Sequence, residues 1–510
     1  MIRYTLRNLT LSVCLFGMSG CNSFFDVDPS DGLPAGDYYK NVNDLNGAAY
    51  GLYAPLAPEV HKLLLWGSAR ADMVTEGDGH DVFVSQFVNN QVSTLNPYTD
   101  YGFLYETIAR CNHHLNNIPK VKPQDVVTPY RLNPFYGEAY FLRAWCYFQL
   151  VRNFKEVPLV QNEIAEQVTY VNRENDTVHM NTLDLNAAEL RAIALQPAGK
   201  QEIWKLIISD LNKALVLLQP SAQLQWNPGF AARAEQILIR ANLNAAYALA
   251  CEVALWNRQY REASNFADVV LNYKTSVGGA STWSTQYTVA EMPSANYTLL
   301  VFTYQYAGAF NTNRLQEFTS SVEADGGAYY LKPQMEVCDR IFDESLDVRR
   351  RSSWMRVNRK DVIWKYIGRD EEGKAMREPY QSTAPWHLYH PSEVYLMKGI
   401  AENRLGNSGA AFEMLNRVRA SRELLVYLEG EIPMDLISLE DMLFKEKARE
   451  TAFEGKRWYD LLLMEEVFGR TGMIAHSVAR KYPAEQQAAV IERLSDPENW
   501  YLPIEPERWK

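Results

Sequence analysis

The chain has 510 residues, of which 47% are hydrophobic and 22% are charged, and its formal net charge is −11 at neutral pH. This length supports a large hydrophobic core and by itself allows two or three domains. The acidic balance argues against nucleic acid as a partner, because phosphate backbones require clustered Lys and Arg side chains.

The first 20 residues are predicted to form a secretory signal peptide. Arg3 and Arg7 supply a positive start, and an apolar run of about ten residues follows, half of the ~20 residues that a bilayer-spanning helix needs. The next residues, Met-Ser-Gly-Cys, end at Cys21 and resemble a bacterial lipobox, in which cleavage precedes the cysteine and diacylglycerol is attached to its thiol. An ordinary signal peptide with an incidental cysteine is the alternative. We expect Cys21 to carry a lipid anchor and residues 21–35 to form a tether.

The mature chain is more acidic and has fewer cysteines than the full sequence. Loss of the two N-terminal arginines leaves 62 acidic against 49 basic side chains. Cys14 leaves with the signal and Cys21 is used for the lipid. The remaining four cysteines lie far apart in apolar helical settings, so we predict buried free thiols rather than disulfides at Cys111, Cys146, Cys251 and Cys338.

Helical periodicity dominates from residue 36 to about residue 275. Residues 137–154 show a wide apolar arc, which predicts a deeply packed helix with one face formed by Tyr140, Ala144, Tyr147 and Val151. Residues 203–218 form a second amphipathic pattern, which ends near Pro220.

Helices also occur in pairs. An alanine-rich helix is predicted over residues 240–255, and after a short polar turn a second helix carries an apolar stripe of Ala263, Phe266, Ala267 and Val270. The same pattern recurs in residues 392–421, with Ala411, Met414, Leu415 and Val418. This arrangement is typical of tetratricopeptide-like repeats, with chance helical hairpins as the alternative. We count about four pairs, around residues 101–154, 203–256, 240–271 and 392–421.

The pattern changes between residues 275 and 390. Residues 297–306 alternate Phe302, Tyr304 and Tyr306 with other side chains, which predicts a short strand within a loop-rich region. Long irregular loops of this kind are usually functional. We expect a mainly α fold with a few short strands: one domain over residues 36–510, with helical pairs at about 101–275 and 392–465 and an extended C-terminal segment on its surface.

Motifs for catalysis or metal binding are mostly absent. The chain contains no HExxH, GxSxG or phosphate-loop sequence and no closely spaced cysteines. The sequence Gly-Asp-Gly-His-Asp at residues 77–81 is too short for a dinucleotide fingerprint and follows no predicted strand. His113 and His114, beside Cys111, have no matching partner cluster. We therefore expect no cofactor, no metal and no catalytic residue.

Two carboxylates, Glu450 and Glu454, lie four residues apart on a predicted helix. Such a pair can perform acid–base chemistry on a glycosidic bond. At this spacing, a structural role is the stronger prediction, with the two carboxylates organising Arg449 and Arg457.

Aromatic residues are abundant, with 30 Tyr, 12 Trp and 20 Phe. Sugar rings stack their C–H faces on aromatic rings while their hydroxyl groups bind polar side chains, and such mixed surfaces are typical of ligand sites. Two loops fit this description. The first, within residues 70–101, supplies the candidate ligand-binding residues Asp78, His80, Asp81, Phe83, Asn89 and Asn90. The second supplies Trp283, Tyr287, Tyr304, Tyr306, Phe310 and Asn311. For any single ring, core packing is the default interpretation, and the coincidence of two aromatic loops in an otherwise helical sequence favours a ligand site.

Five ordered segments resemble the SusD/RagB family of outer-membrane nutrient-binding lipoproteins. They are GEAYFLRAWCYFQLVRNFKEVPLV; IISDLNKAL followed by YREASNFADVVL; HPSEVYLMKGIAENRLGN with LNRVRAS; KEKARETAFEGKRWYDLL; and YLPIEPE. The family often has Arg before the Tyr of its RYAEV motif, where this chain has Leu388 before Tyr389.

The resemblance implies a scaffold of four tetratricopeptide-like units that carries an irregular ligand-binding face. It also implies a lipid-anchored protein at the cell surface of the outer membrane, without catalysis, that acts as a lid on a SusC-like TonB-dependent barrel transporter. We expect an oligosaccharide as ligand. A peptide ligand for the same machinery is the main alternative, and a surface glycoside hydrolase is a more distant one.

Overall fold

The structure is a computed structural model, and it describes residues 39–121, 132–161, 167–171, 177–181, 197–219, 239–273, 299–302, 313–323, 326–369, 374, 383–433 and 435–504. The predicted signal peptide, Cys21 and the tether lie outside these residues. Among the helices of the described ranges, none combines the length and the apolar character that a membrane crossing requires.

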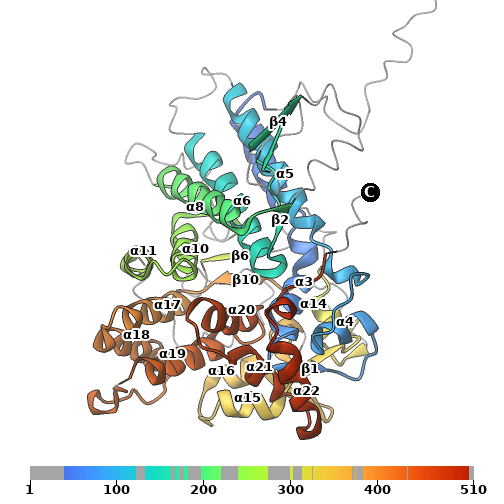
Figure 1. The fold of residues 1–510 in the computed structure, drawn as a ribbon, viewed down its shortest axis with the longest axis vertical. Helices are drawn as coiled ribbons and strands as arrows, with labels where there is room; N and C mark the ends of the chain where they lie inside the picture. The colour runs from blue at the N-terminus through green and yellow to red at the C-terminus, as the bar shows by residue number, and fades with distance from the viewer. Residues whose placement is uncertain are drawn as a thin grey trace, which may run out of the picture.

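Helices make up most of the described chain, as predicted (Figure 1). The N-terminal half contains α2 (Val42–Tyr53), α3 (Val60–Leu64), α4 (Val82–Val88), α5 (Gly102–Asn117), α6 (Asn133–Phe154), α8 (Lys200–Leu217), α10 (Leu243–Trp256) and α11 (Tyr260–Tyr273). The C-terminal half contains α14 (Leu315–Thr319), α15 (Met335–Ile341), α16 (Val348–Ser353), α17 (Pro391–Arg404), α18 (Ser408–Ser421), α19 (Leu436–Glu450), α20 (Arg457–Leu462), α21 (Met473–Ala479) and α22 (Ala484–Leu494).

The long helices pack in succession into one stack. Helix α5 packs on α6, α6 on α8, α8 on α10, α10 on α11, α11 on α17, and α17 on both α18 and α19 (Figure 1). The predicted pairs at 101–154, 240–271 and 392–421 are therefore confirmed as α5–α6, α10–α11 and α17–α18. The predicted stripes face the interior, because Ala263, Ala267 and Val270 are fully buried, as are Ala411 and Val418.

Side-chain caps define where several of these helices begin. Asn41 accepts hydrogen bonds from the backbone N–H groups of Asn43 and Asp44 at the start of α2, while the Asp44 carboxylate accepts one from the Asn41 backbone. Asn242 accepts one from Ala245 N at the start of α10. Such caps satisfy backbone donors that have no partner within the helix.

The strands are short, and each pairs with one other strand. They are β1 (Val74–Glu76) with β7 (Leu331–Pro333), β2 (Val157–Pro158) with β5 (Pro197–Ala198), β3 (Gln167–Val171) with β4 (Thr177–Asn181), β6 (Leu300–Phe302) with β10 (Trp386–Tyr389), and β8 (Trp354–Val357) with β9 (Lys360–Ile363), all antiparallel. Strand β6 confirms part of the strand predicted at 297–306, Leu299 precedes this strand, and residues 297–298 and 303–306 lie outside the described residues. Strand β1 corrects the expectation that no strand precedes residues 77–81, since three residues are too few to show alternation.

One hydrophobic core runs through both halves of the chain. Its buried side chains extend from Leu52 to Leu502, and they include Trp66 of a π-helical turn (Leu65–Ala69) and Trp458 of α20. The C-terminal segment lies on this core, because Trp500 is buried and the Leu502 N–H donates to the Asn153 carbonyl oxygen at 2.7 Å. A final segment on the body of the protein was predicted, and this part of it is confirmed.

A buried carboxylate joins two helices of the stack to strand β10. Glu252 of α10 accepts a hydrogen bond from Arg152 of α6 at 2.6 Å and another from the Tyr389 hydroxyl of β10. Tyr389 follows Leu388, the position where the family often has Arg. Removing one partner of such a group leaves the other buried and unpaired.

This group predicts acid sensitivity. Burial raises the pKa of Glu252, but Arg152 and Lys456 outweigh burial and lower the pKa to about 2, compared with ~4.3 in an unfolded chain. The stability that Glu252 contributes is therefore present above pH ~4.3 and is lost as the pH falls toward 2. We expect Glu252→Gln to flatten the decline in the urea-derived free energy of unfolding between pH 5 and pH 3. The exposed control Glu413→Gln should show the same fall in the free energy of unfolding as the wild type. If Glu252→Gln also shows the wild-type fall, Glu252 is not a source of the acid sensitivity.

Candidate functional site

The first candidate loop is held in place by two close backbone contacts. After β1, Gly77 N–H donates to the Tyr330 carbonyl oxygen at 2.9 Å, and Gly79 N–H donates to the Tyr329 carbonyl oxygen at 3.0 Å. A Cβ atom on Gly77 would lie 2.0 Å from the Tyr329 oxygen, and one on Gly79 would lie 1.9 Å from the Ala328 oxygen. Only glycine allows this approach. The contact directs the intervening Asp78 and the following His80 to solvent, and both are exposed.

Asp78 is joined to a second segment of the chain. Its carboxylate forms an ion pair with Lys360 Nζ at 2.7 Å, at the tip of the β8–β9 hairpin, and Lys360 also lies 5.1 Å above the Tyr329 ring. The hydrogen bond from Lys360 lowers the pKa of Asp78 below its ordinary value. Asp78 is thus an ionised acceptor at neutral pH, oriented toward the hairpin and still open to water.

Asp81 and Phe83 lie at the start of α4. The Asp81 carboxylate caps the helix by accepting from Phe83 N–H at 2.8 Å and Val84 N–H at 3.0 Å, and it accepts from the Tyr98 hydroxyl at 3.3 Å. Phe83 is half-buried against the core, and its neighbour Val82 has 66% of its surface exposed. The cap fixes the direction of α4, so the apolar side chains at its start remain at the surface.

Asn89 and Asn90 hold the end of α4. The Asn89 side-chain amide donates to the Glu76 carboxylate at 2.6 Å and to the Ser85 carbonyl oxygen at 3.0 Å. Asn90 is buried with a φ of +51°, and its amide donates to the Arg70 carbonyl oxygen at 2.9 Å. The structure therefore gives both side chains a supporting role in the loop, and Asn90 lies beneath its surface.

The structure adds residues that sequence periodicity did not identify. Arg314 forms a bidentate ion pair with Glu317 and donates to the Tyr98 hydroxyl at 3.4 Å. Leu95 on the same loop has 68% of its surface exposed. Arg314, Tyr330 and Lys360 are more than 200 residues from Asp78 in the sequence, and only the pairing of β1 with β7 and the hairpin contact bring them near.

The second candidate loop cannot be placed beside the first. Its six residues, Trp283, Tyr287, Tyr304, Tyr306, Phe310 and Asn311, all lie outside the described residues. Of the twelve predicted ligand-binding residues, the structure thus brings Asp78, His80, Asp81 and Phe83 together on one exposed loop. It places Asn89 and Asn90 behind that loop.

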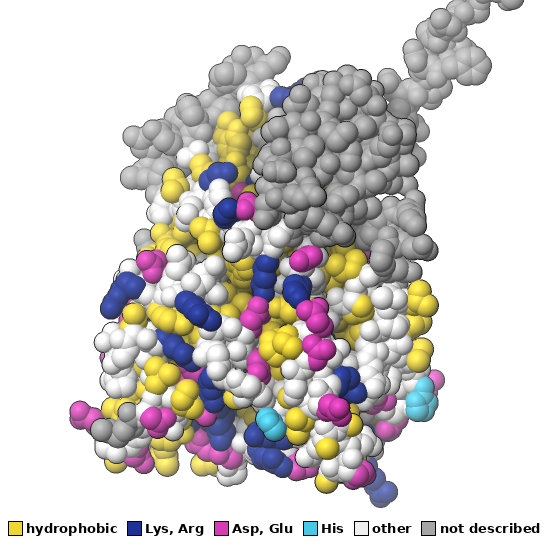
Figure 2. Space-filling model, in the orientation of Figure 1, with side chains coloured by type: hydrophobic (Ala, Val, Ile, Leu, Met, Phe, Trp, Pro, Cys, Tyr) yellow, Lys and Arg dark blue, Asp and Glu magenta, His cyan; other side chains and the backbone are white. Residues whose placement is uncertain are grey.

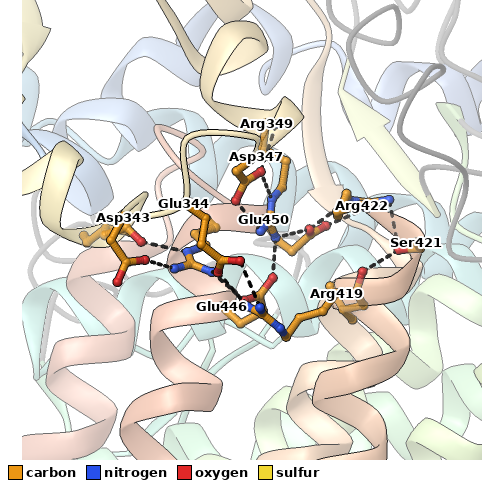
Figure 3. Close-up of polar contacts among 12 residues, drawn as sticks. Asp343, Glu344, Asp347, Arg349, Arg419, Ser421, Arg422, Glu446 and Glu450 are labelled. Carbon is orange, nitrogen blue, oxygen red and sulfur yellow. Dashed lines mark hydrogen bonds and ion pairs between the residues drawn. The ribbon is translucent and has the colours of Figure 1, made fainter. Parts of the chain in front are cut away.

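Glu450 lies in a buried ionic network (Figure 3). Glu454 is buried in ion pairs of its own, so the two carboxylates do not form an accessible pair. Glu450 ends α19 and accepts two hydrogen bonds from Arg422, at 2.9 and 2.8 Å, and one from Arg349 at 2.6 Å. Glu454 follows the helix and pairs with Lys365 at 2.7 Å and with His390 at 2.8 Å.

The predicted partners of these two carboxylates were wrong, although a structural role fits. Arg449 instead binds Asp343, Glu344 and Glu446, and Arg457 binds Asp72. The reason is local: the helix ends at Glu450 and Phe453 has a φ of +64°, so the two carboxylates no longer share a helical face. Burial would raise the pKa of Glu450, but Arg422 and Arg349 lower it to about 2, the opposite of what a general acid requires.

The cysteines and histidines show no sign of metal binding in the described ranges. The four predicted cysteines are buried free thiols, as expected, and burial raises the pKa of Cys338. His114 is buried, and its Nδ1 lies 3.1 Å from the Tyr39 hydroxyl. Among the described residues, no three His, Cys, Asp or Glu side chains are grouped so that they could hold a metal ion.

Sequence comparison places most of the chain within two related family models. One, described as "Starch-binding associating with outer membrane", matches residues 67–255, and the other, described as "SusD family", matches residues 268–508. SusD-like protein P38 of Formosa agariphila is 24% identical over 482 residues, covering 87% of this chain and 88% of that protein. SusD-like protein P2 of the same organism is 25% identical over 517 residues, covering 91% and 92%.

Solved structures share the fold. A SusD superfamily protein from Bacteroides vulgatus superimposes with a TM-score of 0.71 at 18% identity, covering 92% of this chain and 97% of that one. A protein described as a laminarin-binding SusD-like protein superimposes with a TM-score of 0.65 at 20% identity, covering 91% and 96%. The helical scaffold is therefore a shared fold.

Proposed function

The chain belongs to the SusD/RagB family, and on that basis we propose that it binds oligosaccharide at the outer-membrane surface without chemical change. It then passes the ligand to a SusC-like TonB-dependent barrel, over which it acts as a lid. Cys21 carries the lipid that keeps the protein at the membrane. Binding and release are coupled to opening and closing, because ligand contacts differ between the two states.

One observation carries the proposed ligand class: the loop after β1 presents polar and apolar side chains together on a rigid support. Asp78 and His80 offer hydrogen-bonding groups, while Phe83 and the exposed Val82 and Leu95 offer apolar surface. A carbohydrate needs both kinds of contact, since its C–H faces are apolar and its rim is polar. A neighbour with the same fold is described as laminarin-binding, which supports a glycan.

The absence of catalysis is part of the proposal. The carboxylates that could hydrolyse a glycosidic bond, Glu450 and Glu454, are fully engaged with cations and sealed from solvent. The exposed carboxylate at the candidate loop, Asp78, has a lowered pKa and therefore cannot serve as the protonated acid at neutral pH.

We expect Phe83→Ala and Trp283→Ala each to weaken glycan binding by about tenfold, which corresponds to ~1.4 kcal/mol. The mature chain would first be screened on glycan and peptide arrays, and affinity for the best ligand would be measured by calorimetry. Leu425→Ala is the matched control, because Leu425 has 86% of its surface exposed on the segment between α18 and α19.

Three results would contradict this proposal in different ways. If the protein binds only peptides on the arrays, its ligand is a peptide and not an oligosaccharide. Unchanged glycan affinity in Phe83→Ala and Trp283→Ala would refute the site while leaving the function intact. Shortening of the bound glycan by the purified protein would refute the non-catalytic role.

A further inference from the structure

We propose that a cleft between α15, α19, α20 and α21 binds a small organic anion, a carboxylate or a sulfate ester carried on a sugar ring. The cleft has a volume of about 410 Å³, within the ~300–1,000 Å³ that is usual for small-ligand sites. It shares no residue with the candidate loop after β1. The proposal therefore goes beyond the function proposed above and does not depend on it.

Positive charge dominates the wall of this cleft, in a chain whose net charge is −11. One acidic side chain, Asp441, lines it, against five cationic ones: Arg340, Lys445, Arg457, Arg470 and Arg480. Figure 2 shows Lys and Arg side chains gathered beside a His at the lower centre of this face, where Figure 1 places α15 and α21. The charge of the cleft wall is therefore opposite in sign to the net charge of the whole protein.

Four of these cations already have carboxylate partners, but most of those carboxylates do not line the cleft. Arg340 pairs with Glu336, Lys445 with Asp343, and Arg457 with Asp72, and none of these three acids lines the cleft. Arg470 pairs with Asp441, which does line it, and with Glu440, which does not. The partners hold the guanidinium groups in position while the cations form the surface that a ligand would meet.

The arginines retain donors for a ligand. Arg457 uses Nε and Nη2 on Asp72, at 2.9 and 2.8 Å, and Arg470 uses Nη1 on Asp441 at 2.6 Å. A guanidinium has five N–H donors. Within the described part of the chain, Arg457 Nη1 and Arg470 Nε and Nη2 have no hydrogen-bond partner, and they are not among the unpaired atoms sealed from solvent.

Two further side chains, Arg480 and His476, are exposed at the rim. Neither side chain forms an ion pair or hydrogen bond with the described residues. Arg480 can therefore close a bidentate contact on an incoming carboxylate or sulfate without first breaking another one.

The rest of the wall suits a sugar ring rather than a bare ion. Ile341, Phe444, Met464 and Met473 give the cleft an apolar side. The start of α21 adds no anion site, because the Glu465 carboxylate already accepts from Gly472 N–H at 2.6 Å and Ile474 N–H at 2.9 Å. The guanidinium groups and the apolar wall thus select a ligand with one charged and one apolar face.

The test titrates the mature chain with D-glucuronate, glucose 6-sulfate, glucose and inorganic sulfate by calorimetry in low and high salt. We expect one or both sugar anions to bind, more weakly at high salt because part of the wall is open to solvent, and glucose to show no saturable binding. Comparison of D-glucuronate with glucose 6-sulfate shows whether the cleft prefers a carboxylate or a sulfate ester. Arg480→Gln should weaken binding about tenfold, whereas Arg417→Gln, which changes another exposed Arg, on α18, should not change it.

The proposal is overturned if neither sugar anion binds, if glucose binds equally well, or if inorganic sulfate binds as tightly as the sugar anions. It is also overturned if Arg480→Gln retains wild-type affinity. Binding of the array-selected glycan at the loop after β1 should be unaffected by Arg480→Gln when that glycan is neutral. The experiment therefore tests the anion site in the cleft separately from the proposed glycan site at the loop after β1.

Discussion

Replacement of Arg349 by methionine is expected to lower the free energy of unfolding by about 3–5 kcal/mol. Arg349 is completely buried, and three carboxylates surround its guanidinium group: Asp347 at 2.8 and 2.6 Å, Glu446 at 2.7 Å and Glu450 at 2.6 Å. Without the guanidinium these carboxylates lose a shared cation in a site that water cannot reach, and that unpaired charge is the source of the loss.

The position of Arg349 in the network explains the size of the effect (Figure 3). Arg349 lies in α16 and joins Asp347, the residue before that helix, to Glu450 at the end of α19. Glu450 connects onward to Arg422 at the end of α18. The carboxylates outweigh burial and hold the pKa of Arg349 well above its ordinary value, so the group is charged at all accessible pH values.

Urea denaturation of Arg349→Met beside Arg417→Met is the measurement. Arg417 forms an exposed ion pair with Glu413 at 3.7 Å, with 61% of each side chain accessible, and its loss should cost less than about 1 kcal/mol. Equal losses in the two variants would show that the buried network contributes no more than a surface pair.

Gly67→Ala is expected to prevent folding or to cost more than about 3 kcal/mol. Gly67 lies in the π-helical turn before Arg70, and a Cβ atom there would be 2.0 Å from the backbone oxygen of Gly455. Gly455 is held in place, because its N–H donates to Ser68 Oγ at 2.9 Å and the Leu63 carbonyl oxygen and the Trp386 ring lie against it. Its φ of +68° also belongs to the left-handed region that favours glycine.

The control for this prediction is Gly409→Ala. Gly409 lies in the first turn of α18 with open space around its Cβ position, so alanine should be neutral or stabilise by about 0.4–1 kcal/mol through the unfolded state. Thermal and urea unfolding of both variants gives the comparison. A fully folded Gly67→Ala protein with an unchanged midpoint would refute the close contact between the two segments.

The helices could be predicted because their signal is local. The apolar residues Ala263, Ala267 and Val270 recur at the spacing of an α-helix. This spacing puts them on one face of the helix, and that face is buried against the rest of the protein. The five segments that resemble the SusD/RagB family are also contiguous. One of them contains Gly455, whose role in the contact with Gly67 becomes apparent only when the two segments meet.

The ion-pair partners could not be predicted in the same way. Glu450 and Glu454 were expected to share a helical face, but α19 ends between them, and their partners come from segments as distant as Arg349 and Lys365. A helix end depends on backbone conformation at one or two residues, which the spacing of charges does not reveal.

The sequence alone therefore determined the helical repeat pattern, the family resemblance and the expectation of free thiols, since each depends on neighbouring residues or on a motif. Tertiary structure decided which charges meet, how the loop around Asp78 is supported by Tyr329 and Lys360, and where a basic cleft forms on an acidic protein. The physical reason is that these features join residues far apart in the chain. Their distances depend on how the whole core packs, and no local pattern carries that information.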